Sequence, residues 1–337
     1  MRQKVEALHW KPGEGAKVQC QLCPHSCVIG DGGKGICGTR VNRKGVLYAD
    51  GHGIYPVVHL DPIEKKPLNH FLPGRRILSV GSVGCNLKCR HCQNFSLSCD
   101  GPEGMEDYYL PPETLVEGAL EKGSIGVAFT YNEPTINFEY LMEVSPKLRS
   151  KGAKVVHVTN GHLSEGPWTE LMEHTDAANI DVKGFTEDFY RRIVGGHLAP
   201  VLRNVEIAVR NDVHVEIAYL VIPGLNDDDD QLKGFVGWVL SSLGPDVPIH
   251  FTRFHPDNKM LDIPPTPVDT LFRARKSAME TGVHYVYVGN IWDDETGNTR
   301  CPQCSALLVS REGFSAKVMN MKDGRCGKCG LEIAGVW

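Results

Sequence analysis

Three cysteines stand close together in the segment Cys85-Asn-Leu-Lys-Cys89-Arg-His-Cys92. The segment directly follows residues 77–83, an apolar run of strand length. Three thiolates can each ligate one iron of a [4Fe–4S] cluster, which leaves the fourth iron without a protein thiolate. An iron with an open position can chelate a small molecule. We therefore expect Cys85, Cys89 and Cys92 to hold an open cluster that acts in catalysis.

The same residues allow two other sites. A zinc site could use three of these cysteines with His91 or Cys99, and a closed cluster could take Cys99 as its fourth ligand. Zinc sites usually pair CxxC units, or CxxC with HxxxH, whereas the first gap here is longer. Cys99 lies seven residues after Cys92, outside the short ferredoxin spacing. The spacing favours the open cluster and leaves the role of Cys99 undecided.

A second cysteine group lies near the carboxyl end of the sequence. Cys301-Pro-Gln-Cys304 and Cys326-Gly-Lys-Cys329 enclose two runs of strand-like residues. Two CxxC turns that face each other across a hairpin form the ligand set of a zinc ribbon. We expect Zn²⁺ here, with a second iron–sulfur cluster or free thiols as alternatives. Four thiolates leave no open position, so this site should be structural or partner-binding.

A third group, near the amino end, lies in a Gly-rich stretch that favours turns. Zinc and an auxiliary [4Fe–4S] cluster are equal alternatives for this group, and His25 could substitute for one ligand. The four cysteines are Cys20, Cys23, Cys27 and Cys37.

Composition limits the class of protein. With 337 residues, 41% hydrophobic and 23% charged, the chain is neither collagenous nor wholly disordered. A net charge of −5 provides no bulk basic field for nucleic acid or anionic lipid. We find neither an apolar run of membrane-spanning length nor a signal peptide, so we expect a cytoplasmic protein without a membrane partner. In a reducing compartment, clustered cysteines more often bind metal than form disulfides.

Apolar runs of strand length alternate with helix-like amphipathic segments between the cysteine groups. Such alternation predicts an α/β fold, either a doubly wound sheet or a full or partial βα barrel, with chemistry at the carboxyl ends of the strands. We expect three regions: residues 1–72, 73–293 and 294–337. The predicted strands are 77–83, 125–130, 154–159, 178–182, 213–222, 248–254 and 283–288, and the predicted helices are 112–121, 136–150, 168–174, 187–194, 229–242 and 268–281.

The central cysteine segment, with a βα pattern behind it, resembles the radical S-adenosylmethionine (SAM) superfamily. More narrowly, the chain resembles pyruvate formate-lyase activating enzymes and the radical SAM member of the AmmeMemoRadiSam system. The resemblance implies a partial (β/α)6-type barrel with an N-terminal Cys-rich module and a C-terminal zinc-ribbon-like module. The segments that carry it, besides 84–94, are residues 64–74, 130–135, 251–256 and 297–302.

The resemblance also implies an activity. A radical SAM enzyme reductively cleaves SAM at its [4Fe–4S] cluster, and the 5′-deoxyadenosyl radical abstracts hydrogen from a substrate, which is unidentified here. Activases use a glycine on a partner protein as that substrate. The implied partners are a one-electron donor of the flavodoxin or ferredoxin type, Memo-like or Amme-like proteins, or a protein substrate.

Several SAM contacts follow from the resemblance. Glu133 would pair with the methionine ammonium, and Thr159 with Asn160 would approach the ribose and carboxylate. Val158 stands where activases carry Asp, which puts a carboxylate there in doubt. Without the resemblance, Glu133 also fits a helix N-cap before Pro134. The full set of predicted cofactor contacts is Asn132, Glu133, Thr159, Asn160, Asp181, Lys183, Ile222 and His255.

A different function class is a metal-stabilised module that binds nucleic acid through the carboxyl-terminal cysteine region. Six basic residues support it: Arg300, Arg311, Lys317, Lys322, Arg325 and Lys328. We do not expect nucleic acid to be the main partner, because the chain as a whole is acidic.

Overall fold

An eight-stranded sheet lies at the centre of the computed structural model, which describes residues 4–99, 101–121, 123–293 and 295–337. Strands β7 to β13 are parallel to their neighbours, and β6 is antiparallel to β7. In sheet order the strands are β13 (Val286–Gly289), β12 (Ile249–Arg253), β11 (His214–Val221), β10 (Ala177–Asp181), β9 (Lys154–Thr159), β8 (Gly126–Phe129), β7 (Arg76–Gly81) and β6 (Val57–Pro62).

The order of the parallel strands follows the order of the chain without reversal. A doubly wound sheet reverses its order at a switch point, so that alternative was wrong and the barrel-type winding is confirmed. Six βα units lead from β7 to β13, and right-handed crossovers place successive helices on one face of such a sheet. Strands β6 and β13 form the two edges of this sheet. The sheet is therefore open.

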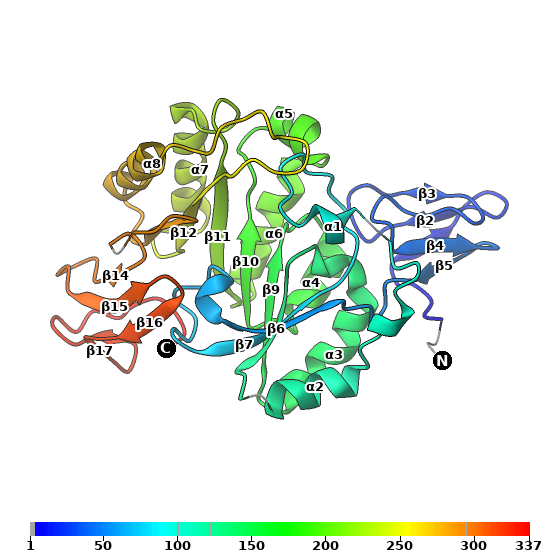
Figure 1. Ribbon diagram of the computed structural model, residues 1–337, viewed down its shortest axis with the longest axis horizontal. Coiled ribbons are helices and arrows are strands. Elements are labelled where there is room, and N and C mark those ends of the chain that lie inside the picture. Colours follow the sequence, from blue (N-terminus) through cyan, green and yellow to red (C-terminus); the bar gives the residue numbers. More distant parts are fainter. Residues whose placement is uncertain (1–3, 100, 122, 294) are drawn as a thin grey trace.

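Helices cover the outer face of the sheet (Figure 1). The main helices are α2 (Pro112–Glu121), α3 (Phe138–Ser150), α4 (Glu165–Met172), α6 (Leu198–Arg210), α7 (Asp229–Ser242) and α8 (Val268–Thr281). Shorter turns are η1 (Ile63–Lys65), α1 (Phe95–Ser98), η2 (Glu106–Tyr108), η3 (Pro134–Asn137), α5 (Glu187–Phe189) and the π-helical turn η4 (Tyr190–Val194).

The sequence did not predict α6. Between β10 and β11 it predicted only residues 187–194, which form α5 and the π-helical turn η4. Pro200 lies in the first turn of α6, where the missing N–H costs no helical hydrogen bond. Pro167 lies likewise in the first turn of α4. That helix therefore begins at Glu165, earlier than the predicted residue 168.

Residues 63–72, which we call the floor segment, cover part of the inner face of the sheet. Leu68 and Phe71 are buried there against Ile77, Val156 and Ala177 of the strands. The Asn179 side chain of β10 donates to the carbonyl of Pro67 over 2.8 Å. The interior of the open barrel is thus filled by a loop rather than by strand residues alone.

Small sheets lie on opposite sides of the central sheet (Figure 1). The N-terminal ones contain β1 (Trp10–Pro12), β2 (Val18–Cys20) and β3 (Val28–Ile29), and the pair β4 (Arg40–Arg43) and β5 (Val46–Ala49). The C-terminal ones contain β14 (Thr299–Arg300), β15 (Leu307–Glu312) and β16 (Ser315–Val318), and the pair β17 (Met321–Lys322) and β18 (Arg325–Cys326).

The C-terminal sheets, which we call the ribbon (residues 295–337), are joined to the floor segment. Leu72 N–H donates to the Val336 carbonyl and Val336 N–H to the His70 carbonyl, each over 2.7 Å. The predicted boundary residue 294 lies outside the described residues, and the division into three regions stays a prediction. None of the described helices has the length and apolar character needed to cross a bilayer.

Candidate functional site

A cavity of about 450 Å³ opens at the carboxyl ends of the parallel strands. Cys85, Cys89 and Cys92, on the loop after β7, all line it. The predicted contacts Asn132, Glu133, Thr159, Asn160, Asp181 and Lys183 also line it. The structure therefore brings the three central cysteines and six of the eight predicted cofactor contacts together around one cavity.

The cysteine loop is held by main-chain hydrogen bonds. Lys88 N–H donates to the carbonyl of Val194, and Arg90 N–H to that of Ile193, each over 2.9 Å. Burial raises the pKa of Cys89 to about 11 and that of Cys85 well above its ordinary value, an effect that the nearby Glu133 reinforces for Cys85. These thiols are protonated at neutral pH, so a metal must displace their protons when it binds.

The three central sulfur atoms are not gathered for a single ion. Among the described residues, one group of cysteines has all its sulfur atoms within 4.8 Å of one another, and it is the C-terminal group. In a [4Fe–4S] cluster each thiolate binds a different iron, which needs wider separations than one tetrahedral ion does. The donor set around the cavity thus fits a cluster better than a single zinc ion.

Glu133 is a buried carboxylate between the loops after β8 and β9. It accepts hydrogen bonds from Thr135 N–H at 3.0 Å, Thr135 Oγ1 at 2.7 Å, Thr159 Oγ1 at 2.7 Å and Asn160 N–H at 2.8 Å. Burial raises the pKa of Glu133 although these donors oppose the shift. A cation in the cavity would stabilise its charged form. The helix-capping role and a ligand role are therefore compatible in this side chain.

Two asparagines position the cysteine loop. Asn160 Nδ2 donates to Asn86 Oδ1 over 2.9 Å and lies 3.8 Å from Cys85 Sγ. Asn132 accepts from Ser82 N–H at 3.0 Å and donates to the Gly84 carbonyl at 2.8 Å. Asn160 and Asn132, on the loops after β9 and β8, therefore hold the residues on either side of Cys85 in place.

Asp181 and Lys183 form an ion pair at the end of β10, with Lys183 Nζ 3.0 Å from Asp181 Oδ2. Burial disfavours the lysine charge, but Asp181 and the sulfur of Cys89 outweigh it and raise the pKa of Lys183. The ammonium therefore stays charged in the cavity wall, where it faces the cysteine loop.

Two predicted contacts lie outside the cavity. Ile222 is fully buried in the core, and Leu220 lines the cavity instead. Ile222 follows the last residue of β11, Val221, so the strand no longer sets the direction of its side chain. His255 is exposed and lines a neighbouring hollow with Gln93 and Asn290, which border both spaces. The structure therefore does not bring the side chains of Ile222 and His255 to the central cysteines.

Some cavity residues were not singled out from the sequence. Lys65 and Lys66 of the floor segment line the cavity, as does Asn179. His91, which the sequence offered only as a zinc ligand, lines it too. Burial lowers the pKa of His91 to about 3, so its imidazole is neutral. The charged run Glu64-Lys65-Lys66 before Pro67 was the available sequence signal, but no periodicity showed that it enters the barrel.

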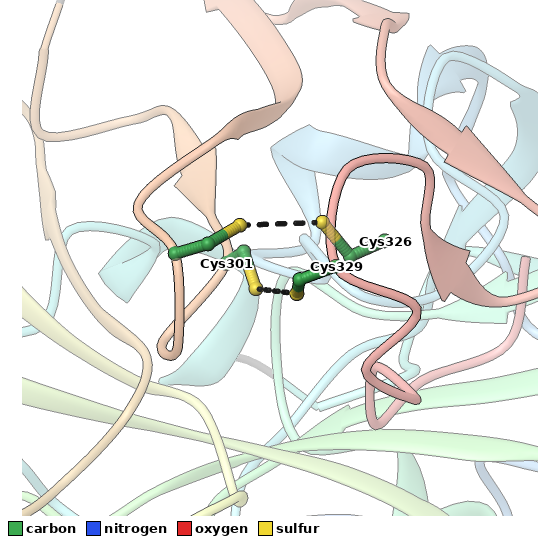
Figure 2. A group of neighbouring side chains, drawn as sticks. Cys301, Cys326 and Cys329 are labelled. Carbon is green, nitrogen blue, oxygen red and sulfur yellow. Dashed lines mark hydrogen bonds between the residues drawn. The ribbon is translucent and has the colours of Figure 1, made fainter.

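Cys301, Cys304, Cys326 and Cys329 converge in the ribbon, as predicted from their spacing (Figure 2). Cys301 Sγ lies 3.5 Å from Cys329 Sγ, and Cys304 Sγ lies 3.6 Å from Cys326 Sγ. Zn–S bonds of about 2.3 Å in a tetrahedron place sulfur atoms roughly 3.8 Å apart. The four thiols can therefore bind one metal ion.

The N-terminal cysteines do not converge in this way. Within the described part of the chain, no three of Cys20, Cys23, Cys27 and Cys37 meet within 4.8 Å. Arg40 Nη1 lies 3.7 Å from Cys20 Sγ, and His25 Nε2 lies 2.7 Å from the Asn86 carbonyl. His25 thus contacts the residue after Cys85, and the metal at these cysteines stays a prediction.

Parts of the sequence are similar to known proteins. A family model described as "Radical SAM superfamily" matches residues 79–236. An uncharacterized protein of Methanocaldococcus jannaschii is 41% identical over 330 residues, which are 97% of this chain and 98% of the relative. The pyruvate formate-lyase-activating enzyme of Clostridium pasteurianum is 24% identical over 163 residues, 48% of this chain and 68% of that enzyme.

A solved structure, SuiB of Streptococcus suis bound to S-adenosylmethionine, is similar with a TM-score of 0.50 and 12% identity, over 67% of this chain and 52% of SuiB. This likeness shows the fold. The cavity, the sequence match and the relatives agree. The chain carries a radical SAM domain over residues 79–236 and is homologous to pyruvate formate-lyase-activating enzymes.

Proposed function

We propose that this protein is an enzyme that reductively cleaves SAM at a [4Fe–4S] cluster held by Cys85, Cys89 and Cys92. The resulting 5′-deoxyadenosyl radical abstracts a hydrogen atom from a substrate. One observation carries the proposal: in a radical SAM chain, these three cysteines line one cavity with buried charged groups at the carboxyl ends of the strands.

The position of Cys99 supports a cluster with one iron that has no cysteine ligand. Cys99 is exposed and is absent from the described lining of the cavity. A closed cluster with Cys99 as its fourth ligand would require that loop to move. The fourth position is therefore left to SAM.

When bound, the cluster supplies one electron to the sulfonium of SAM, which breaks the bond to C5′ and yields methionine and the radical. A one-electron donor of the flavodoxin or ferredoxin type provides that electron. Glu133 pairs with the methionine ammonium as a buried carboxylate. Thr159 and Asn160 approach the ribose and carboxylate, and Asp181 and Lys183 border the same space. Asn132 holds the cysteine loop. Within the segment 220–226, Leu220 rather than Ile222 borders adenine, because Leu220 lines the cavity, and His255 lies in the neighbouring hollow.

The ribbon cysteines hold Zn²⁺ in our proposal, because their sulfur separations suit one tetrahedral ion. The N-terminal cysteines hold a second metal or cluster. We place the protein in the cytoplasm, where reduced thiols persist.

A second candidate is a glycyl-radical activase that acts on a partner protein. It is favoured by homology to pyruvate formate-lyase-activating enzymes, including one of Escherichia coli at 24% identity over 162 residues, 47% of this chain and 65% of that enzyme. Memo-like or Amme-like proteins are alternative partners, in line with the resemblance to the AmmeMemoRadiSam enzyme.

Nucleic-acid binding by the ribbon has less support. Arg300 pairs with Glu295 at 3.0 Å, and Arg325 pairs with Glu332 at 2.6 Å. Arg311 is buried against the floor segment. Half of the predicted basic patch is therefore neutralised or covered.

The test is 5′-deoxyadenosine production by the anaerobically reconstituted full chain with SAM and dithionite. Wild type and Cys99→Ala should both form the product, and Cys85→Ala should form none. Product from Cys85→Ala at the wild-type rate would overturn the cysteine assignment. Failure of wild type with full iron content, also after addition of candidate partners, would overturn the activity.

A further inference from the structure

The floor of the cavity carries a fixed ammonium group. The side chain of Lys66 is 1% exposed. Its Nζ lies 2.7 Å from Asp61 Oδ2 and 4.8 Å from the centre of the Tyr131 ring. A lysine is rarely buried unless it is paired, and here the pairing holds the charge at the cavity wall.

The floor also carries more positive than negative charge. Lys65 Nζ lies 3.0 Å from Asp61 Oδ1, so two ammonium groups share one carboxylate. The Tyr131 hydroxyl donates to Asp61 Oδ2 over 2.6 Å. These donors outweigh the effect of burial and lower the pKa of Asp61. With Asp61 ionised, the cluster of Lys65, Lys66 and Asp61 has a net charge of +1.

The other charged groups of the cavity lie on the loops after the strands. Asp181 and Lys183 pair with each other. Glu133 is a single carboxylate whose oxygens accept four hydrogen bonds from the loops after β8 and β9. The positive charge of the floor segment therefore comes from Lys65 and Lys66, which share the one carboxylate of Asp61.

A hydrogen-bond acceptor without a partner lies beside these lysines. Asn179 is 1% exposed, and its Nδ2 donates to the carbonyl of Pro67 over 2.8 Å. That bond fixes the orientation of the amide, and Oδ1 has no hydrogen-bond partner. A buried acceptor without a donor is costly. Asn179 lines the cavity next to the residue that follows Lys66, so a ligand can supply the missing donor.

We propose that the floor is a substrate subsite for a small organic oxyanion, a carboxylate or phosphate, with a hydroxyl or amide N–H beside the charge. Lys65 and Lys66 bind the oxyanion, and Asn179 Oδ1 accepts the neighbouring donor. The proposal rests on the proposed function, because it gives the substrate class of the same cavity. Lysine suits either oxyanion because it acts as a point charge.

The depth of the subsite favours a small molecule over a folded partner. Lys66 and Asn179 are each about 1% exposed, and the cavity of about 450 Å³ is of the size that holds small ligands. A protein substrate would have to insert an extended loop past the cysteines to reach the floor. A small acid needs no such insertion.

The test measures binding rather than turnover. We would titrate the cluster-reconstituted full chain, saturated with SAM, with glycolate, acetate, glycolamide and inorganic phosphate, using ligand-observed NMR. Glycolate has both the charge and the donor, acetate lacks the donor, and glycolamide lacks the charge. Variants are Lys66→Met, Lys65→Gln and Asn179→Leu. Lys154→Gln is the matched control, because Lys154 is similarly exposed and also pairs with an aspartate.

Glycolate or phosphate should bind, and glycolate should bind more tightly than acetate and glycolamide. We expect the Kd of the bound anion to rise about tenfold in Lys66→Met and about threefold in Lys65→Gln, with no change in Lys154→Gln. Asn179→Leu should remove the preference for glycolate over acetate while acetate binding persists. Lys65 is partly exposed, so Lys65→Gln keeps the test decisive if Lys66→Met fails to fold.

Three results would overturn the subsite. The anions could fail to bind, or bind equally to wild type and Lys65→Gln. Lys66→Met could weaken the binding of SAM but not of the anions, which would make Lys66 a SAM contact instead of a substrate contact. A glycine-containing acidic peptide could bind with lysine dependence when no small acid does. Because binding is measured without SAM cleavage, loss of cleavage with intact anion binding would count against the proposed function only.

Discussion

The two ends of the parallel sheet are built in opposite ways. At the amino ends, the ribbon and the floor segment cover the open barrel. Glu216 accepts from His70 N–H at 2.6 Å there and lies 2.6 Å from His250 Nε2. At the carboxyl ends, a cavity stays open, and His91 Nδ1 and Asn179 Oδ1 lack partners.

The cysteines follow the same division. The ribbon cysteines converge on one point, whereas the central cysteines are spread along the cavity wall. Buried polar atoms without a hydrogen-bond partner occur at both ends, among them Glu64 Oε2 and Arg311 Nε beside the ribbon. The two ends therefore differ in the open cavity and in the spread of their cysteines, not in whether every polar group is paired. In our proposal, the converging cysteines hold a structural metal and the spread cysteines hold the catalytic cluster.

The largest expected effect comes from removing one cysteine ligand at each metal site in turn. Cys92→Ala should lose the central iron and essentially all 5′-deoxyadenosine formation but keep the ribbon metal. Cys326→Ser should lose the ribbon metal but keep the central iron. Elemental analysis with iron and zinc counted per chain checks both. Loss of both metals in both variants would contradict the separation of the ends.

Loss of the ribbon metal should unfold the ribbon locally, because small metal modules owe their folding to the ion. In Cys326→Ser we expect rapid proteolysis within residues 295–337 while the barrel persists. Limited proteolysis with mass spectrometry of the fragments detects this. A ribbon as resistant as wild type would show that the metal is dispensable there.

The joint between ribbon and floor can be weakened without touching a cysteine. Arg311 is buried, and its guanidinium donates to the Asn69 carbonyl at 2.5 Å and to Thr299 Oγ1 at 2.8 Å. Arg311→Met should lower the free energy of unfolding by about 3 kcal/mol, since buried carbonyls lose a charged donor. The exposed Arg325→Met should cost less than about 1 kcal/mol. If denaturant titrations gave the same loss of unfolding free energy for Arg311→Met and Arg325→Met, the contact between ribbon and floor segment would not stabilise the fold.

Acid should weaken the closed end through His70. Burial lowers the pKa of His70 to about 4, whereas the unfolded chain binds a proton near the ordinary value of about 6.5. Stability from this group is complete above about pH 6.5 and is lost as pH falls toward 4. From pH 7 to 5, wild type should lose about 2 kcal/mol more than His70→Gln.

Denaturant titrations at both pH values measure the His70 effect. His284→Gln is the control, because His284 is exposed and pairs with Asp246 on the surface. If His70→Gln and His284→Gln behaved alike, the acid sensitivity would have another origin.

Local sequence patterns were sufficient for the strands and the metal-binding spacings. Each predicted run between residues 77 and 288 overlaps a parallel strand, because strands buried on both faces are continuously apolar. The ribbon ligands were also predictable, since CxxC turns bring sulfur atoms together locally. The sequence therefore located the loop of Cys85 at the correct end of the correct strand.

Features decided by distant contacts were not predictable. The floor segment has no helical or strand periodicity, and its place depends on Leu68 and Phe71 packing inside the sheet. Asn179 reaches Pro67, the residue after Lys66, only because of that packing. Ile222 was assigned to the site from its segment, but its side chain faces the core. Spacing alone also could not show that the sulfur atoms of Cys20, Cys23, Cys27 and Cys37 converge less closely than those of the ribbon.

The central claim is that SAM completes the open end by binding the iron that has no cysteine. The most direct measurement is the EPR spectrum of the dithionite-reduced full chain, before and after addition of SAM, with Cys326→Ser alongside. We predict a reduced [4Fe–4S] signal whose g values shift when SAM is added, equally in wild type and Cys326→Ser. An unchanged spectrum, under conditions where equilibrium dialysis shows that SAM is bound, would contradict the claim.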